Sequence, residues 1–537
     1  PLQTGTSIRL DNPGGGKTIF NIPFFNLVEG SGGLIGALGW PGRYLLTLSR
    51  PADDAVVITA GLESLHLSLH AGEEIRTPLV LLLPWQGDLA DAHNRLRRHV
   101  LAHHTPKLDG KPATVPISHA GWGGMKTSTA LELVRQITQQ NLGYENFWMD
   151  AGWYGADRAV DEFQVFNEED WFLHAGNWRV NRVPHPDGLA PISRAAHENG
   201  LKYLLWFEPE RAVVGTPLTQ EHPDWFIGEA ATEFLGHSSR PYVRYRLFNF
   251  GNPEARLWMT DLISQRVEEL GIDIYRQDCN FSLAPFWDAV DTPKRRGIAE
   301  IRYVEGLLEF WDDLRRRHPG LLLDLTQRGD LETITRGFDL TRSDYNIAPE
   351  SDPMGNQAAT MGLAHWRPHC GTMIQTRAGD SYHFRSAFCP GLSFSPFNVA
   401  GTRDQIGNFT AADFPLDWAR KMVEQLKRAR PAMYGDFYPL TSGGLDTTHW
   451  FGYQMHRPDL QEGFVLLLRR PGSALVAGNF VLRGLGETSE YLVEDADSRE
   501  RVVHQGGGLL KEGLEIRIDA APGSRLLFYW ATARSSK

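Results

Sequence analysis

The chain has 537 residues, of which 42% are hydrophobic and 22% charged, and its 54 lysines and arginines are outnumbered by 65 aspartates and glutamates. This composition excludes a disordered or collagen-like chain, and the net charge of −11 argues against a nucleic-acid partner held by bulk charge. No run of about 18 apolar residues occurs, so neither a transmembrane helix nor a membrane partner is expected. At about 150 residues per domain, the length predicts roughly three to four domains.

Cysteine is sparse, with Cys279, Cys370 and Cys389 as an odd set. No disulfide framework is therefore expected, and the lack of a CxxC pair argues against a structural zinc ribbon. The chain starts at Pro1 without a signal-peptide pattern, which leaves the compartment open between the cytoplasm and a processed, exported form. The 16 tryptophans fit either sugar stacking or a large packed core.

Residues 1–112 are predicted to form an N-terminal β-domain, similar to a sandwich. Short apolar runs bounded by Gly and Pro, such as 33–38 and 79–83, are typical of strands. An amphipathic helix over 89–101 links this region to the next.

Residues 113–430 change to an alternation of short apolar strands and longer helical patterns. Strands are expected at 117–123, 147–153, 202–208, 272–278, 321–326, 340–344 and 392–397. Helices are expected at 127–140, where a Thr or Ser would cap the start, and at 192–198, 254–270 and 297–317. Six or more β–α repeats predict a (β/α)8 barrel, with a doubly wound open sheet as the alternative. No GxGxxG follows the first strand, which argues against a dinucleotide site.

Residues 431–537 return to strands, at 464–468, 514–518 and 526–530. These runs predict a C-terminal antiparallel β-sandwich. The expected fold is therefore multidomain, a (β/α)8 barrel flanked by two β-domains.

Acidic residues end four of the predicted barrel strands. These residues are Asp150, Glu208, Asp278 and Asp344. Catalytic groups of such barrels sit at the carboxyl ends of strands, and repeated carboxylates there are costly unless they meet solvent, a cation or a ligand.

A pair of carboxylates is what glycoside hydrolysis requires, and Asp278 and Asp344 are the candidates. A separation of about 5–5.5 Å would indicate retention of anomeric configuration, and about 6.5–9.5 Å inversion. Arg276 shares a strand face with Asp278 and favours its ionised form. Because Arg342 stands in the same relation to Asp344, these neighbours do not assign the two roles.

Five segments resemble glycoside hydrolase family 36, the α-galactosidase family of the clan of retaining α-glycosidases. In chain order the segments are DAGWYG at 150–155, WFEPE at 206–210 with HPDW at 222–225, RQDCN at 276–280, DLET at 330–333 and RSDY at 342–345. The resemblance implies Asp278 as nucleophile and Asp344 as acid/base in a double displacement with retention. It implies no metal and no cofactor, and an oligosaccharide or glycoconjugate as the substrate.

The remaining sugar-site candidates flank these carboxylates. They are Asp150, Trp153, Trp206, Glu208, Arg276, Asn280, Arg328 and, in the 362–369 segment, Trp366. Asp150 is expected to bind sugar hydroxyls, and the tryptophans to stack on a sugar or to pack the barrel. Arg328 is expected to hold a hydroxyl or acetamido oxygen, or to pair with Asp330.

Three positions depart from the family pattern and leave the substrate open. Ala151 replaces the second Asp of a pair, Arg276 replaces a Lys, and 326–329 replaces a Cys-Ser-Gly-rich segment. An α-galactosidase is the first reading, and an α-N-acetylgalactosaminidase on the same scaffold the second. Transglycosylation and a catalytically inactive sugar-binding protein are further alternatives, and the oligomeric state stays open.

Metal binding is not expected at the one suggestive histidine pair. His365 and His369 are four residues apart, but Pro368 lies between them and no Glu follows the first histidine as in HExxH.

Overall fold

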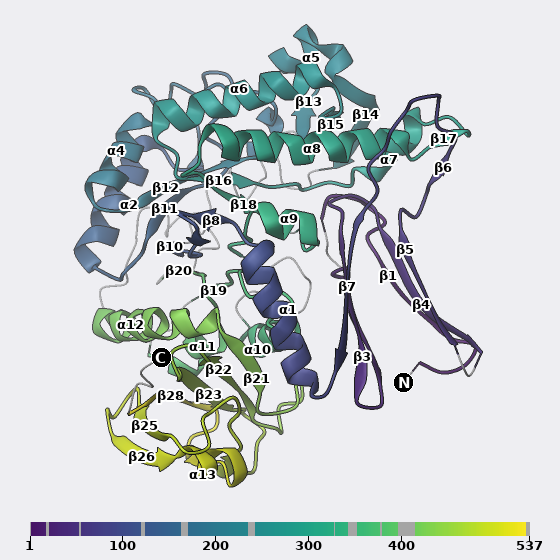
Figure 1. The fold of residues 1–537 in the computed structure, drawn as a ribbon. Coiled ribbons are helices and arrows are strands. Elements are labelled where there is room, and N and C mark those ends of the chain that lie inside the picture. The colour runs from purple at the N-terminus through teal and green to yellow at the C-terminus, as the bar shows by residue number, and fades with distance from the viewer. Residues whose placement is uncertain are drawn as a thin grey trace.

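The computed structural model describes residues 2–17, 21–52, 55–119, 124–162, 170–234, 242–326, 328–341, 352–375, 379–395 and 414–532. Figure 1 shows a central α/β region with long N-terminal strands on one side and a strand-rich C-terminal region below it. None of the helices in these ranges is long and apolar enough to cross a membrane.

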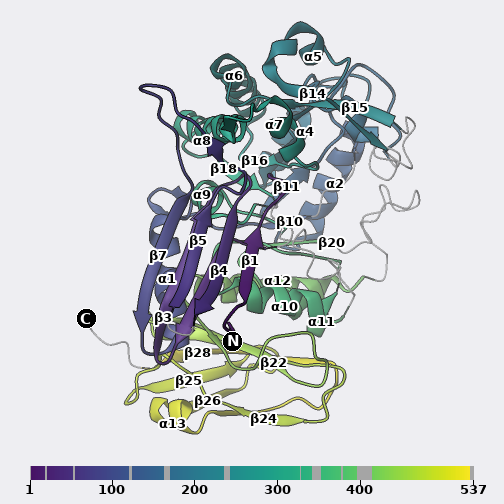
Figure 2. The ribbon, with the colours of Figure 1, turned by 90° about the vertical axis from the view of Figure 1, so that its right-hand side faces the viewer.

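The N-terminal strands form two antiparallel sheets of three strands, ordered β1-β4-β5 and β2-β3-β7. They stand side by side in Figure 2. The elements of this region are β1 (Ser7–Asp11), β2 (Phe24–Glu29), β3 (Gly32–Gly39), β4 (Leu45–Ala52), β5 (Ala55–Gly61), β6 (His66–Leu67), β7 (Leu79–Gln86), α1 (Leu89–His103), β8 (Lys107–Leu108) and β9 (Lys111–Pro112). The predicted linking helix is confirmed as α1, whose N-cap Asp88 accepts the N–H groups of Ala90 and Asp91.

A seven-stranded parallel sheet forms the centre, in the order β18-β16-β12-β11-β10-β20-β19. Its strands are β10 (Ile117–His119), β11 (Asn146–Met149), β12 (Lys202–Phe207), β16 (Ile274–Gln277), β18 (Leu322–Leu325), β19 (Met373–Gln375) and β20 (Leu392–Ser395). Five of them (β10, β11, β12, β16 and β18) are buried along their whole length or nearly so, as expected for parallel strands covered by helices.

Beyond β18, a parallel bridge pairs Asp324 with Phe338. The N–H of Gly371 then donates to the Asp339 carbonyl at 2.7 Å, which links the 338–341 segment toward β19.

Helices and smaller strands surround this sheet. They are α2 (Thr127–Gln140), η1 (Asp170–His174), α4 (Ala190–Glu198), β13 (Arg211–Val213), α5 (Pro217–Glu221), η2 (Pro223–Trp225), β14 (Phe226–Phe234), β15 (Tyr242–Phe248), α6 (Pro253–Leu270), α7 (Ala284–Val290), β17 (Arg295–Arg296), α8 (Ile298–Arg317), α9 (Leu331–Arg336), α10 (Pro353–Leu363), α11 (Ser381–Ser386) and α12 (Leu416–Met433). Asn252 caps the start of α6, and Gly271 ends it in the left-handed conformation. The expected Thr or Ser cap of α2 is wrong, because Lys126 occupies the N-cap with no side-chain bond and the Thr127 hydroxyl pairs with His185 instead.

The C-terminal region contains a six-stranded antiparallel sheet ordered β21-β22-β23-β28-β25-β26 and a two-stranded sheet of β24 and β27. Its elements are β21 (Asp436–Pro439), β22 (Phe451–Arg457), β23 (Glu462–Arg469), β24 (Ala477–Phe480), β25 (Glu490–Asp495), β26 (Arg501–Gln505), α13 (Gly506–Lys511), β27 (Leu514–Arg517) and β28 (Gly523–Ala531). One apolar core contains residues of this sheet, of α12 and of the central region together.

Two ion pairs of the buried Arg43 connect the N-terminal region to the centre. Arg43 donates to Glu300 of α8 at 2.7 Å and to Asp288 of α7 at 2.9 Å. The indole N–H of Trp40 donates to the same Glu300 at 3.0 Å. Since Glu300 is buried, separating these elements would leave a charge unpaired in the interior.

Candidate active site

Asp278 lies directly after β16, and its carboxylate accepts four hydrogen bonds. Oδ1 accepts from the Cys279 N–H at 2.8 Å and the Thr326 hydroxyl at 3.1 Å. Oδ2 accepts from the Asn280 side-chain amide at 2.8 Å and from the indole N–H of Trp206 at 3.3 Å. The side chain is therefore held in one orientation, while the residue remains partly exposed.

The pKa of Asp278 lies below its ordinary value. Burial acts to raise this pKa, but the charges of Lys17 and Arg276 and the hydrogen bonds from Asn280 and the Cys279 N–H outweigh it. The carboxylate is thus ionised at neutral pH, as a nucleophile requires.

Arg276 lies on β16, two residues before Asp278, and its guanidinium interacts with two other acids. Its Nη1 donates to Asp324 at 2.5 Å, its Nε lies 3.9 Å from Asp150, and its guanidinium lies 4.3 Å from the ring centre of Trp148. Asp150 accepts from the Trp148 indole N–H at 2.7 Å. Burial raises the pKa of Asp150 to about 6, and the negative charge of Asp278 adds to the rise.

Glu208, at the end of β12, is fully buried and supports its neighbours. It accepts the Asn280 backbone N–H at 2.7 Å and pairs with Arg211, whose Nε lies at 2.7 Å. Burial, followed by the charge of Asp278, raises the pKa of Glu208 to about 7. Its contacts fix the turn that carries Asn280.

The predicted sugar-facing tryptophans lie in different surroundings. Trp206 is 2% exposed and reaches Asp278 through its indole N–H, with its ring stacked on Tyr154 at 5.9 Å. Trp153 is fully buried and donates to the Trp206 carbonyl at 3.0 Å, which gives it a packing role. Trp366 packs at the N-terminal strands, 5.8 Å from Phe24.

Arg328 pairs with Glu210 and not with Asp330, one of the two partners expected for it. It is buried, donates to Glu210 at 2.5 Å and to the Pro41 carbonyl at 3.0 Å, and so joins the end of β18 to the N-terminal region. Asp330 instead caps α9. Glu210 also accepts from Gln277 at 2.9 Å, so Arg328 belongs to a buried network that reaches the residue before Asp278.

Asp344, with Arg342 and Ser343, lies outside the described residues. The acid/base role of Asp344 and its separation from Asp278 therefore stay predictions. In the described ranges, no group of three or more His, Cys, Asp or Glu side chains could hold a metal ion.

Lys17 is a residue of the candidate site that the sequence did not predict. Its Nζ donates to Asn280 Oδ1 at 2.9 Å, across 263 positions of the chain. A lysine after three glycines carries no local signal of this role, because its partner is set only by the packing of the N-terminal loop on the central region.

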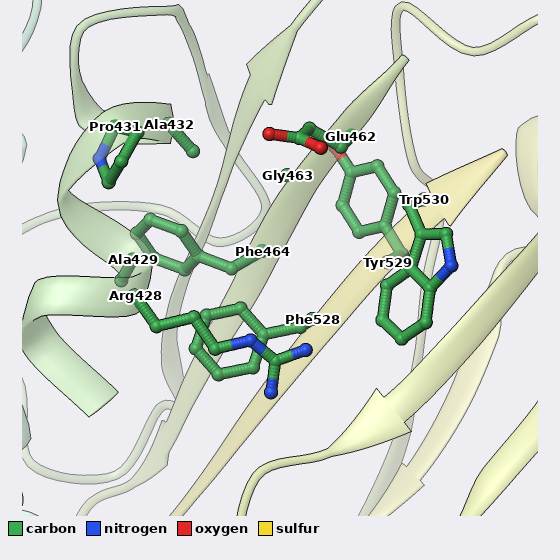
Figure 3. A pocket seen from close by; sticks show the side chains of 10 residues that line it. All are labelled: Arg428, Ala429, Pro431, Ala432, Glu462, Gly463, Phe464, Phe528, Tyr529 and Trp530. Atoms are coloured by element: carbon green, nitrogen blue, oxygen red, sulfur yellow. The ribbon is translucent and has the colours of Figure 1, made fainter. Parts of the chain in front are cut away.

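A separate cavity of about 240 Å³ lies between α12 and the C-terminal sheet. Figure 3 shows Arg428 beside Phe528, and Glu462 across the cavity. Among its described lining residues Glu462 is the single carboxylate, so this cavity lacks the acid pair that glycoside hydrolysis needs.

Carboxylates gathered where the strands of a parallel sheet end are the arrangement expected of a glycoside hydrolase. The melibiase family model matches residues 86–331 of the chain. The resemblance to glycoside hydrolase family 36 is thus confirmed.

Curated relatives agree with this match. α-Galactosidase 1 of Pediococcus pentosaceus is 26% identical over 78% of this chain and 56% of its own length. α-Galactosidase Mel36A of Lactobacillus acidophilus is 25% identical over 77% of this chain and 55% of its own length. The chain therefore spans little more than half the length of these relatives.

Solved structures share the fold. The family 36 α-galactosidase AgaA of Geobacillus stearothermophilus superposes with a TM-score of 0.78 at 19% identity, over 99% of this chain and 72% of AgaA. The α-galactosidase of Lactobacillus brevis gives a TM-score of 0.78 at 18% identity, over 100% of this chain and 72% of its own. The multidomain fold with a parallel central sheet is thus that of family 36 α-galactosidases.

Proposed function

We propose that the chain is a retaining, exo-acting α-galactosidase that hydrolyses terminal α-galactosyl residues by double displacement. The observation that carries the proposal is Asp278, an ionised carboxylate oriented by four hydrogen bonds where β16 ends. The curated relatives named above are α-galactosidases, and crystals of doubly substituted variants of AgaA contain raffinose or stachyose. Oligosaccharides with a terminal α-galactose are therefore the substrate class we favour.

In the proposed reaction, Asp278 attacks the anomeric carbon and forms a β-galactosyl ester as the glycosidic bond breaks. Asp344 gives its proton to the departing oxygen. Asp344 then takes a proton from a water molecule, whose oxygen attacks the same carbon and releases Asp278. Two inversions leave the product in the α-configuration.

The substrate contacts follow from what each side chain still offers. We assign sugar binding to Asp150, Arg276, Asn280 and Trp206, which surround the nucleophile. Glu208, Trp153 and Arg328 support this shell from the interior. Trp366, by its packing, belongs to the junction with the N-terminal strands.

The same proposal extends to the fold. We infer that the 338–341 segment is the eighth strand, which turns the seven-stranded sheet into a closed (β/α)8 barrel. The parallel bridge to β18 and the bond from Gly371 support this closure. The domains are then 1–112, 113–430 and 431–537, with the outer two as an N-terminal β-domain and a C-terminal β-sandwich.

The test compares nitrophenyl α-galactoside with nitrophenyl α-N-acetylgalactosaminide, with Asp278→Asn as the control. Faster release from the galactoside, lost in Asp278→Asn, is the expected result. Preference for the N-acetylgalactosaminide would move the substrate assignment to the alternative on the same scaffold. No turnover of any α-glycoside would overturn the enzymatic proposal.

A further inference from the structure

A glycine-rich loop of the N-terminal region docks on the segment that follows the nucleophile. The loop, residues 12–17, comes after β1. The carbonyl of Gly14 accepts the backbone N–H groups of Leu283 at 3.0 Å and Ala284 at 2.9 Å, together with the Ser282 hydroxyl at 3.0 Å. Three donors at the start of α7 thus fix one point of the loop.

The next two residues can approach so closely only as glycines. Gly15 has φ +64°, and a Cβ there would lie 2.5 Å from the ring of Trp287. Gly16 has φ +75°, and a Cβ there would lie 3.1 Å from the Cys279 sulfur. The absent side chains let the backbone lie against the residues that flank Asp278 and place Lys17 beside the site.

Lys17 then reaches the nucleophile through one intermediary. Its ammonium donates to Asn280 Oδ1 at 2.9 Å, and the Asn280 amide donates to Asp278 Oδ2 at 2.8 Å. A cation that holds the carbonyl end of an amide aims the N–H₂ end at the carboxylate. The bond to Asn280 uses one of the three donors of the ammonium.

The other charged side chains near Asp278 already form ion pairs with residues other than Asp278. Arg276 of β16 is paired with Asp324, and it also lies near Asp150. Glu208, directly after β12, is paired with Arg211. Asp150 and Glu208 oppose ionisation of Asp278, so the positive charge from the N-terminal loop acts against two buried acids.

We propose that Lys17 is a positioning residue for the nucleophile, supplied to the active site by the N-terminal region. Its ammonium orients Asn280 and favours the ionised form of Asp278. This inference rests on the proposed function, in which Asp278 is the nucleophile.

The test uses the full chain with Lys17→Met, which removes charge and hydrogen bond, and Lys17→Gln, which keeps a donor without charge. Lys17→Arg is the rescuing variant. Lys107→Met is the matched control, since it removes an exposed lysine of the same region that donates to the Ala102 carbonyl. Melting temperatures report folding.

The first readout needs no turnover: titration of the Asp278 carboxyl carbon by ¹³C NMR, assigned by its loss in Asp278→Asn. We expect Lys17→Met and Lys17→Gln to raise the pKa of Asp278 by about one unit, and Lys17→Arg and Lys107→Met to leave it at the wild-type value. The second readout is the pH profile of kcat/KM, whose acidic limb should move upward by the same amount in the two neutral variants.

Unchanged titration of Asp278 in folded Lys17→Met and Lys17→Gln would overturn the inference. A shifted titration in a chain that turns over no α-glycoside would support Lys17 as the partner of Asp278 while the proposed function fails. If Lys17→Met does not fold, Lys17→Gln alone decides the outcome.

Discussion

At the residue scale, the candidate site depends on how one carboxylate is stabilised. Asp278 combines four hydrogen bonds with the nearby charges of Lys17 and Arg276, which favour its ionised form. The acids around it shift the other way, because burial raises the pKa of Asp150 to about 6 and that of Glu208 to about 7. Opposite shifts in adjacent carboxyl groups are how an active site separates a nucleophile from its neighbours.

Removing the Asp278 carboxylate should abolish catalysis, and an external nucleophile should restore it. We expect Asp278→Ala to lose more than about 10³-fold in kcat, because no group is left to form the covalent intermediate. Azide is expected to enter the vacated side of the sugar ring, restore turnover and yield a β-galactosyl azide. An α-azide product would contradict the nucleophile assignment, and NMR of the isolated azide distinguishes the two.

The residue scale is also where sequence reasoning was least complete. The position of Asp278 after a buried strand followed from the apolar run that ends at it. The partners of the buried charges did not follow, because a side chain pairs with whatever the fold brings near it. Arg328, for which Asp330 is one of two expected partners, pairs with Glu210, 118 positions away, and Lys17 meets Asn280 across 263 positions.

At the element scale, the glycine-rich loop of residues 12–17 connects the N-terminal strands to the candidate site at the end of β16. Its conformation is set by Gly15, whose left-handed φ and contact with Trp287 leave no room for a side chain. The 12–17 loop is therefore held in one conformation, and this conformation determines the position of Lys17.

Gly15→Ala should displace the 12–17 loop, and Gly5→Ala is the matched control. Both positions have left-handed φ, but a Cβ at Gly5 would meet nothing within 4 Å. Each alanine should cost about 1–2 kcal/mol of folding free energy from its backbone conformation, whereas kcat/KM should fall, by about tenfold, in Gly15→Ala alone. Equal kcat/KM in the two variants would show that the close approach to Trp287 does not hold the site.

Element boundaries followed from sequence wherever apolar periodicity met a clear stop signal. The helix predicted at 254–270 is α6, ended by Gly271 as expected. The start of α2 at 127 was right in position and wrong in its cap, because Thr127 bonds to His185 from a distant segment instead of to its own helix. Tertiary hydrogen bonds compete for capping side chains, and a local pattern does not contain them.

At the scale of the whole molecule, buried titratable groups set how stability depends on pH. Burial lowers the pKa of five buried histidines to about 4, namely His93, His119, His185, His369 and His456. Burial raises the pKa of six acids, and it brings three of them close to neutrality, with Asp150 and Asp324 at about 6 and Glu208 at about 7. The histidines and the acids have opposite effects on how stability changes with pH.

The pKa of a histidine in the unfolded chain is about 6.5. Between this pH and about pH 4, the histidines of the unfolded chain bind protons and the buried histidines of the folded chain do not, so stability falls as pH falls. The three acids are protonated in the fold first, so they add stability over the same range. Ten histidines have a lowered pKa and six acids a raised one. The histidines are more numerous, so we expect the melting temperature to decrease steadily between pH 7 and pH 5. A constant or rising melting temperature in a calorimetric series would contradict this balance.

The architecture of the whole chain was largely predictable, since strand–helix alternation bounded by two strand-rich regions defines few folds. What the sequence did not contain was how the regions meet. Arg43 with Glu300, and the 12–17 loop with α7, are contacts between segments that lie hundreds of positions apart. They decide that the N-terminal region contributes to the candidate site and does not merely precede it.

The central claim is a double displacement through Asp278, and the anomeric form of the first product tests it most directly. Proton NMR during hydrolysis of nitrophenyl α-galactoside resolves α- from β-galactose before the two interconvert. We expect α-galactose as the initial product, with the β-anomer increasing only later by mutarotation. Initial release of β-galactose would show a single inverting displacement and contradict the assignment of Asp278 as nucleophile.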